Sequence, residues 1–159
     1  MPVSSQRRKP KREKPPISLR ARALRLLASR EHSRAELRRK LALDTEDPDQ
    51  LESLLDELAR RGWLSERRVA EQLIHARRGR FGSRRIRQEL LEKGVAEEVI
   101  AAALPRLKES DLDAARMVWR RKFGAAPGTA AERARQVRFM QVRGFDLDTI
   151  FKVIKGDGQ

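Results

Sequence analysis

The chain has 159 residues, no cysteine and a formal net charge of +14 at pH 7. This length suits one compact domain or several small units with neighbouring cores. The lack of cysteine excludes disulfides, thiolate nucleophiles and cysteine-ligated zinc. The charge favours a polyanionic partner, with nucleic acid first. No apolar run approaches the roughly 18 residues of a membrane-spanning helix and no signal-peptide pattern is present, so we expect a cytoplasmic protein without membrane contact.

The first 16 residues carry six basic side chains against one acidic side chain and show no apolar period. This composition predicts a disordered basic tail over residues 1–16. Two roles stay open for it: a flexible arm that adds non-specific affinity for phosphates, or a solubilising leader.

From Ser18 onward, apolar residues recur at intervals of three and four, which is typical of amphipathic helices. Ser33 and Thr129 each precede a glutamate by three residues, as in a capping box. Gly62, Gly94 and Gly144 lie where helices would end in a left-handed cap. The pattern predicts no strand and nine helices, near residues 18–29, 33–43, 48–61, 65–78, 83–93, 96–107, 111–123, 129–143 and 146–155.

The apolar register of the helices repeats along the chain. A shift of 49 residues places Leu37, Leu41, Leu51 and Leu55 on Ile86, Leu90, Ile100 and Leu104; a further 50 places the last three on Met140, Ile150 and Ile154. We therefore predict an all-α fold of three tandem three-helix repeats in an elongated, curved array. The repeats are expected at 17–64, 65–108 and 109–155, with a short disordered end at 156–159.

Two departures from the repeat are visible in the sequence. Gln136 falls where the second copy has Ile86. The first copy has Asp44-Thr45 where the later copies have a basic residue and glycine. We expect the first turn to differ in shape from the other two. Three repeats can complete their cores without a partner chain, so we expect a monomer.

Charge is distributed unevenly along the chain. Residues 77–93 hold seven basic residues and two acidic ones, a net of +5, and residues 116–143 hold eight and one, a net of +7. In both stretches basic side chains can share an outward helix face. We predict that partner or phosphate binding uses Arg77, Arg78, Arg80, Arg84, Arg85, Arg87, Lys93, Arg120, Arg121, Lys122, Arg133, Arg135 and Arg138.

Residues 44–57, in contrast, hold seven acidic residues and no basic one. They could form an acidic patch that meets a basic protein surface. The alternative is an ordinary solvated helix whose acidic first turn complements the helix dipole. The predicted patch comprises Asp44, Glu46, Asp47, Asp49, Glu52, Asp56 and Glu57.

The same helices contain few groups that could read bases or catalyse a reaction. Gln88 and Gln136 could contact base edges, but Arg and Lys dominate the helix faces, so phosphate contact is better supported than base reading. The aromatic residues fall mostly at apolar positions, where packing is expected. His32 and His75 lack a metal-ligand spacing, and no phosphate loop, nucleophile elbow or catalytic carboxylate pair is found. We expect no enzyme activity, no metal and no cofactor.

Several sequence motifs, taken together, resemble those of a known protein family. The segments REHSRAELRRKL, RRGWLSE and GSRRIRQELLEKG, with the looser WRRKFG and RQVRFMQVRGFDLDTIFKVI, resemble the RecX family of recombination regulators over about residues 18–155. The resemblance implies three tandem three-helix repeats, no catalytic residues, and a protein that acts on RecA, the bacterial recombinase. Such proteins usually inhibit strand exchange and ATP hydrolysis by lodging in the groove of the RecA–DNA filament.

The resemblance implies a role in DNA recombination, DNA repair and the SOS response, with RecA, RecA–DNA filaments and the DNA backbone as partners. The alternative from the residues alone is a RecA-independent DNA-binding nucleoid protein or transcription regulator. Whether regulation caps, coats or disassembles filaments is open, as is the repeat that dominates binding.

Overall fold

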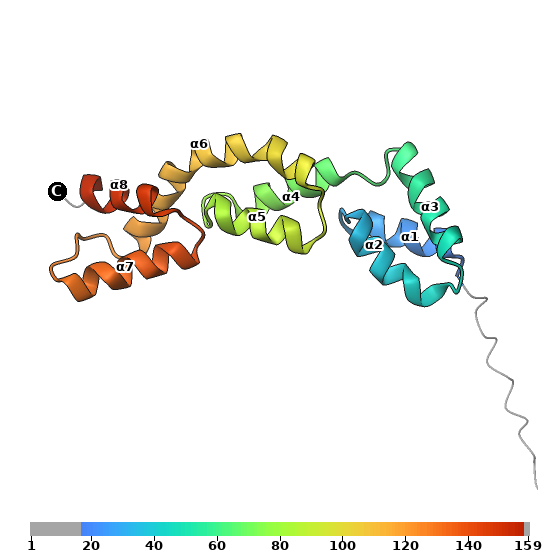
Figure 1. Ribbon diagram of the computed structural model, residues 1–159, viewed down its shortest axis with the longest axis horizontal. Helices are drawn as coiled ribbons and strands as arrows, with labels where there is room; N and C mark the ends of the chain where they lie inside the picture. Colours follow the sequence, from blue (N-terminus) through green and yellow to red (C-terminus); the bar gives the residue numbers. More distant parts are fainter. Residues whose placement is uncertain (1–16, 158–159) are drawn as a thin grey trace, which may run out of the picture.

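The computed structural model describes residues 17–157, which form eight α-helices and one 3₁₀ turn and contain no strand. The helices follow one another in a long, gently curved row (Figure 1). In chain order they are α1 (Leu19–Ser29), α2 (Arg34–Leu41), the 3₁₀ turn η1 (Ala42–Asp44), α3 (Pro48–Arg60), α4 (Glu66–Arg77), α5 (Ser83–Glu92), α6 (Glu97–Lys122), α7 (Ala130–Val142) and α8 (Leu147–Asp157). The predicted all-α array is confirmed.

The two predicted disordered ends lie largely outside the described residues. The basic tail at 1–16 and the last two residues fall there entirely. The remainder of the predicted end is helical, because α8 continues to Asp157.

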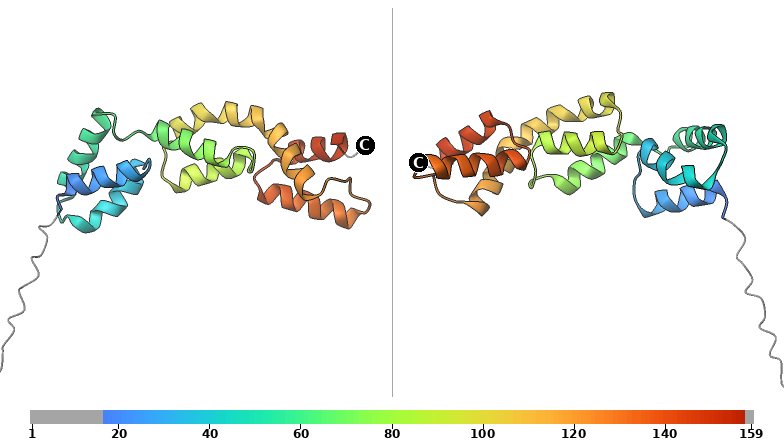
Figure 2. Two further views of the ribbon diagram at one scale, coloured as in Figure 1. Left: turned by 180° about the vertical axis from the view of Figure 1, so that it is seen from behind. Right: turned by 60° about the horizontal axis from the view of Figure 1, so that its bottom comes forward.

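Three separate apolar cores divide the row into units, visible as three bundles in Figure 2. Unit 1 comprises α1 to α3, unit 2 comprises α4, α5 and the first half of α6, and unit 3 comprises the second half of α6 with α7 and α8. The repeated apolar positions of the sequence are buried at matching places in the three units, except Leu104, which is partly buried. They include Leu37 and Leu41 in unit 1, Ile86 and Leu90 in unit 2, and Met140 and Ile150 in unit 3. The apolar register therefore specifies the three cores.

The nine predicted helices become eight because residues 96–107 and 111–123 belong to one helix, α6. Pro105 lies inside this helix, and Figure 1 shows α6 arching from unit 2 to unit 3. Asp111, which the sequence suggests as a helix start, instead lies in the helix interior and turns its carboxylate toward Ser83. The Ser110 hydroxyl donates to the Leu107 carbonyl, 3.0 Å away, within the same helix. Units 2 and 3 thus share a continuous helix.

The capping residues explain where α2 and α7 begin. Ser33 and Glu36 form the predicted capping box, with the hydroxyl and the carboxylate each accepting from the other residue's backbone N–H. Thr129 caps α7 by accepting from the Glu132 N–H, but the Glu132 carboxylate accepts from the Gly128 N–H instead. The second predicted box is therefore half formed.

The glycine turns of units 2 and 3 pack against the first turn of the middle helix in the preceding unit. These helices are α2 in unit 1 and α5 in unit 2. Gly94 has a φ of 76°, and a Cβ there would lie 2.4 Å from the Ala35 Cβ. Gly144 has a φ of 96°, and a Cβ there would lie 2.4 Å from the Arg85 Cβ. The equivalent turn of unit 1 is the glycine-free η1. This contact explains why the second and third repeats both have glycine at this turn. The 3₁₀ turn η1 confirms the prediction that the turn of the first repeat differs in shape.

Gln136 occupies a core position and forms a hydrogen bond at both its side-chain oxygen and its amide nitrogen. Its side-chain oxygen accepts from the Trp119 indole N–H at 2.9 Å, and its amide donates to the Ala125 carbonyl at 3.1 Å. A buried indole N–H needs such an acceptor. The polar Gln136 at a core position of unit 3 therefore supplies the acceptor that Trp119 needs, because Trp119 is only 1% exposed.

Candidate partner-binding surface

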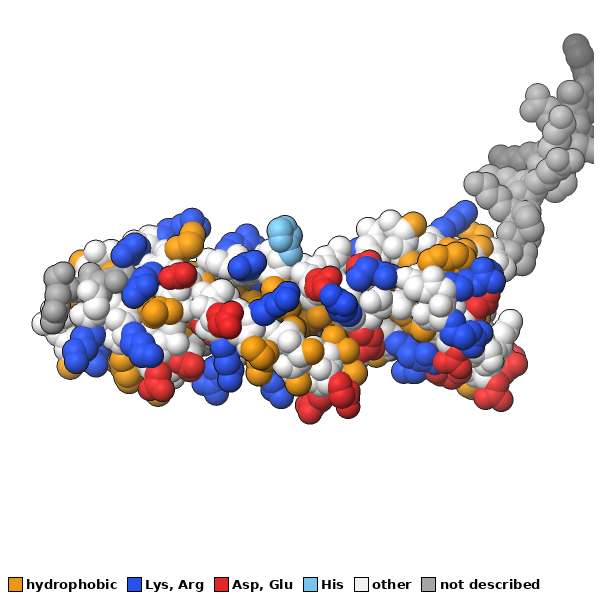
Figure 3. Space-filling model, turned by 90° about the horizontal axis from the view of Figure 1, so that it is seen from above, with side chains coloured by type: hydrophobic (Ala, Val, Ile, Leu, Met, Phe, Trp, Pro, Cys, Tyr) orange, Lys and Arg blue, Asp and Glu red, His pale blue; other side chains and the backbone are white. Residues whose placement is uncertain are grey.

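The predicted basic residues divide into exposed and internally paired groups. Most are exposed, and on the face in Figure 3 basic side chains dominate units 2 and 3, whereas both charges mix on unit 1. Four have carboxylate partners: Arg77 and Arg85 share Glu89, Arg87 pairs with Glu97, and Lys93 approaches Glu36. In the part of the chain that the structure describes, no ion pair joins a carboxylate to Arg78, Arg80, Arg84, Arg121, Lys122, Arg133, Arg135 or Arg138.

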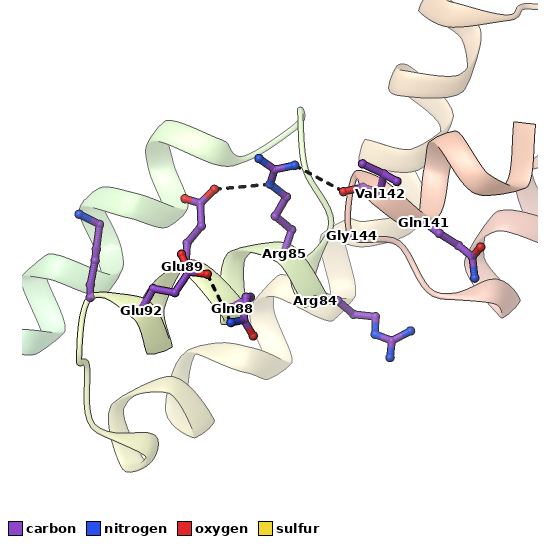
Figure 4. A pocket seen from close by; sticks show the side chains of 9 residues that line it. Arg84, Arg85, Gln88, Glu89, Glu92, Gln141, Val142 and Gly144 are labelled. Atoms are coloured by element: carbon purple, nitrogen blue, oxygen red, sulfur yellow. Dashed lines mark hydrogen bonds and ion pairs between the residues drawn. The ribbon is translucent and has the colours of Figure 1, made fainter.

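A groove of about 700 Å³ lies between α5 and the end of α7, at the junction of units 2 and 3. In Figure 4, Arg85 reaches from α5 toward the end of α7, and Arg84 points to another side. The Arg85 guanidinium lies 3.5 Å from the Val142 carbonyl and 3.6 Å from the Glu89 carboxylate. Arg85 therefore links the two units as well as lining the groove. The lining residues are Arg84, Arg85, Gln88, Glu89, Glu92, Lys93, Gln141, Val142 and Gly144.

Most of the predicted acidic patch pairs with arginines of its own unit. Glu52 accepts from Arg34 and Arg38, and the hydrogen bonds from Arg38 and then Arg34 lower its pKa to about 2. Asp44 pairs with Arg22, Asp56 with Arg34, and Glu57 with Arg20 and Arg61. Asp47 caps α3 by accepting from the backbone N–H groups of Asp49 and Gln50. These contacts offset much of the acidic charge; among the described residues, Glu46 and Asp49 are the patch members whose side chains form neither an ion pair nor a helix cap.

Arginine and lysine side chains also lie over aromatic rings, which the sequence analysis did not anticipate. The guanidinium carbons of Arg77, Arg85 and Arg143 lie 5.9, 4.4 and 5.1 Å from the Phe81 ring centre. The Arg143 guanidinium carbon and the Lys122 Nζ each lie 5.3 Å from the Phe139 ring centre. The sequence gives no local signal for these contacts, because none of the four cations is the chain neighbour of the ring that it covers.

A buried carboxylate closes the junction of units 2 and 3. Gly82, the N-cap residue of α5, offers no side-chain cap, and Asp111 of α6 replaces it by accepting from the Ser83 backbone N–H at 2.9 Å and from the Ser83 hydroxyl. Burial raises the pKa of Asp111 above its ordinary value of 3.8, although the two Ser83 bonds act in the opposite direction. A Cβ at position 82 would lie 2.3 Å from the Gly144 carbonyl oxygen. The close approach of the units thus excludes a local capping side chain.

The two histidines, His32 and His75, differ in burial and in their contacts. His32 is fully buried, its Nδ1 lies 3.0 Å from the Arg30 carbonyl oxygen, and burial lowers its pKa. Its Nε2 lies 3.0 Å from the Lys40 amino group, so a neutral ring can accept there. His75 is exposed. Within residues 17–157, no three His, Asp or Glu side chains gather as a metal site would need, and no helix is long and apolar enough to cross a membrane.

These features define a class: an all-α protein of three tandem three-helix units with basic surfaces on the second and third. Three family domains match the chain in order, described as the first, second and third three-helix domains of RecX, at residues 20–58, 65–104 and 109–154. The chain belongs to the RecX family.

Similar proteins cover nearly the full length. The protein called Regulatory protein RecX from Leptothrix cholodnii is 49% identical over 142 residues, which span 89% of this chain and 90% of that one. The Neisseria meningitidis protein of the same name is 41% identical over 89% of this chain and 92% of its own. The fold resembles the crystal structure of RecX from Lactobacillus salivarius, with a TM-score of 0.71, 19% identity, and coverage of 87% and 93% of the two chains.

Proposed function

We propose that this protein regulates the RecA recombinase, as an inhibitor, by binding along the groove of the RecA–DNA filament. The observation that carries the proposal is the presence of all three RecX domains, in order, over residues 20–154. The relatives are named regulatory proteins, and the proposed role is likewise regulatory rather than catalytic. This role would operate in the cytoplasm, in recombination and repair.

The shape and charge of the molecule support binding along a filament. A curved row of three small units can contact several neighbouring protomers, whereas a compact domain would contact one or two. The exposed basic side chains of units 2 and 3 would meet acidic recombinase surface or DNA phosphates. The remaining acidic side chains of unit 1 would meet basic groove residues. Binding across protomers would then block incoming duplex or the conformational cycle of the filament.

The first test is RecA ATP hydrolysis on single-stranded DNA as this protein is added, with DNA binding by the protein alone measured in parallel. Inhibition well below the concentration that coats the DNA is the expected result. An effect that begins only when the DNA is saturated would contradict filament regulation. It would favour the alternative of a DNA-binding protein that acts without RecA.

Charge reversal tests the electrostatic part of the proposal. Arg84→Glu and Arg138→Glu change exposed residues that form no close ion pair in the described range, although the charge of Arg84 also acts on the Asp146 carboxylate. They should weaken filament binding more at low salt than at high salt, because salt screens exposed charges. Equal loss at all salt concentrations would argue against an electrostatic contact.

A further inference from the structure

We infer that a row of ring-supported cations across the junction of units 2 and 3 binds the phosphate backbone of a nucleic acid strand. The cation row consists of Arg77, Arg85, Arg143 and Lys122, held on the faces of Phe81 and Phe139. The inference deepens the proposed function and rests on it, because it names the surface that would reach nucleic acid within a filament.

The row is continuous because Arg143 contacts both rings. Its guanidinium carbon lies 5.1 Å from the Phe81 ring centre and 5.3 Å from the Phe139 ring centre. Phe81 lies in the loop between α4 and α5, and Phe139 lies on α7. The Phe139 ring is fixed in turn by an edge-on contact with Phe123, at 5.4 Å between centres. Three cations from α4, α5 and α6 and the C-cap residue of α7 are thus held together across the joint of two units.

The charge of the row is only partly neutralised. Arg77 and Arg85 share one carboxylate, Glu89, at 2.9 and 3.6 Å. Across residues 17–157, no ion pair joins Arg143 or Lys122 to a carboxylate. Four cations against one anion give the row a net charge of +3. The unpaired members lie at its unit 3 end, so anion binding should depend most on Arg143 and Lys122.

The aromatic support suits phosphate contact better than base reading. A guanidinium that stacks on a ring by its face keeps its N–H edges free for bidentate contacts with an oxyanion. Because cations cover their faces, Phe81 and Phe139 are poor stacking platforms for bases. Several cations in series fit a partner whose charges also recur in series, as the phosphates of a nucleic acid do. An acidic peptide is the competing partner, and the test below distinguishes it.

The neighbouring groove extends the same surface. Arg85 belongs to the cation row and also lines the groove of about 700 Å³. Gln88, Gln141 and Lys93 line the groove as well and offer hydrogen-bond donors for sugar and phosphate oxygens. A strand that crosses the cation row could therefore continue beside α5. The joint between units 2 and 3 would act as a backbone-binding site without base specificity.

The test is fluorescence anisotropy of a labelled single-stranded oligonucleotide at several salt concentrations. The double variant Arg143→Gln/Lys122→Gln should weaken binding about tenfold or more and reduce the slope of log affinity against log salt by about 1.4, at about 0.7 per lost phosphate contact. The control, Arg25→Gln/Arg39→Gln, removes two exposed cations from unit 1 and should change affinity by less than about threefold, as expected from long-range charge alone.

Two further variants test the rings. Phe81→Leu keeps apolar packing and every charge but removes the ring face, so binding should weaken by a few-fold while the salt slope stays unchanged. Arg143→Lys keeps the charge and loses the planar group, and should bind between wild type and the glutamine double variant. Thermal unfolding by circular dichroism checks that each variant is folded; full affinity in the folded glutamine double variant would overturn the inference.

Other outcomes are equally decisive. Equal weakening by the row pair and the control pair would show that net charge alone drives binding. Equal weakening of oligonucleotide and poly-glutamate binding would replace nucleic acid with acidic peptide as the partner. If the row variant binds DNA normally while wild type still inhibits RecA, the inference fails and the proposed function stands. If the row variant loses DNA binding while the wild-type protein has no effect on RecA, the proposed function fails and the cation row stands as a nucleic acid site.

Discussion

The two junctions of the array use the same geometry but different chemistry. At both, the start of a middle helix packs against the glycine turn of the next unit. Between units 1 and 2, Ser33 caps its own helix and ion pairs Arg68–Glu31 and Lys93–Glu36 span the joint. Between units 2 and 3, α6 runs through the joint and Asp111 supplies the missing cap. The second junction is thus held by a continuous helix and buried hydrogen bonds, and the first by two ion pairs and a hydrogen bond from the Ser33 hydroxyl to the Lys93 carbonyl oxygen.

The largest expected effect follows from Gly144→Ala. The new Cβ would lie 2.4 Å from the Arg85 Cβ and 2.6 Å from its backbone nitrogen, at a φ of 96°. Backbone strain and the clash with main chain together should cost about 2–4 kcal/mol in the free energy of unfolding, measured with urea. Gly62→Ala is the matched control, because its φ is 74° but nothing lies within 4 Å. It should lose only about 1 kcal/mol, and equal losses would refute the packing argument.

Gly94→Ala tests the equivalent contact at the first junction. Its new Cβ meets the Ala35 Cβ at 2.4 Å, but the nearest backbone atom is 3.9 Å away, so the neighbours can shift more easily than at Gly144. We expect a loss of about 1–3 kcal/mol, including the strain of a left-handed alanine. Ala35→Gly in the same chain should recover part of this loss. Additive losses in the double variant would show that the two positions do not touch.

Asp111 variants separate the cap from its charge. Asp111→Ala leaves the Ser83 N–H and hydroxyl without their acceptor in a buried site, which should cost about 1–3 kcal/mol. Asp111→Asn keeps an acceptor oxygen and removes the buried charge, so its loss should stay below about 1 kcal/mol. Equal losses for the two variants, measured by urea unfolding, would mean that the carboxylate charge itself is required.

The sequence predicts the cores well because apolar spacing is a local property. Leu37, Ile86 and Met140 were expected inside from the register alone, and all are buried. The single helix α6 was missed because Asp111 and Ser110 resemble a helix start, and only the tertiary position of Ser83 gives Asp111 its role. The ring-supported cations were missed for the same reason. Phe81 and Arg143 are 62 residues apart in the chain, and no local pattern reports that they meet.

Acid should affect the two regions in opposite directions. The pKa of Glu52 in unit 1 is lowered from 4.5 to about 2, so its stabilising contribution is present above pH 4.5 and is lost as the pH falls toward 2. The pKa of Asp111 is raised above 3.8, so the folded state binds this proton more tightly. Its contribution to stability is present below pH 3.8 and is lost as the pH rises through the folded pKa.

The two tryptophans can report the folding of each region separately. Trp63 reports on unit 1, and the buried Trp119 reports on unit 3. Their indole N–H signals in an NMR pH titration should change separately, with Trp63 losing its native signal first as the pH falls. Asp111→Asn should remove the acid-side gain at the second junction and leave the Trp63 transition unchanged. A simultaneous loss of both signals would show that the units unfold as one.

The smallest effect is expected from the ion pair Arg68–Glu31 at the first junction. The two atoms lie 2.9 Å apart, but the side chains are 43% and 25% exposed, and Arg68 also donates to the Gly62 carbonyl. A double-mutant cycle with Arg68→Gln and Glu31→Gln should give a coupling below about 1 kcal/mol that shrinks in high salt. A coupling of several kcal/mol, unchanged by salt, would make the first junction as firmly built as the second. In that case the continuous helix α6, rather than the chemistry of the contacts, would be the whole difference between them.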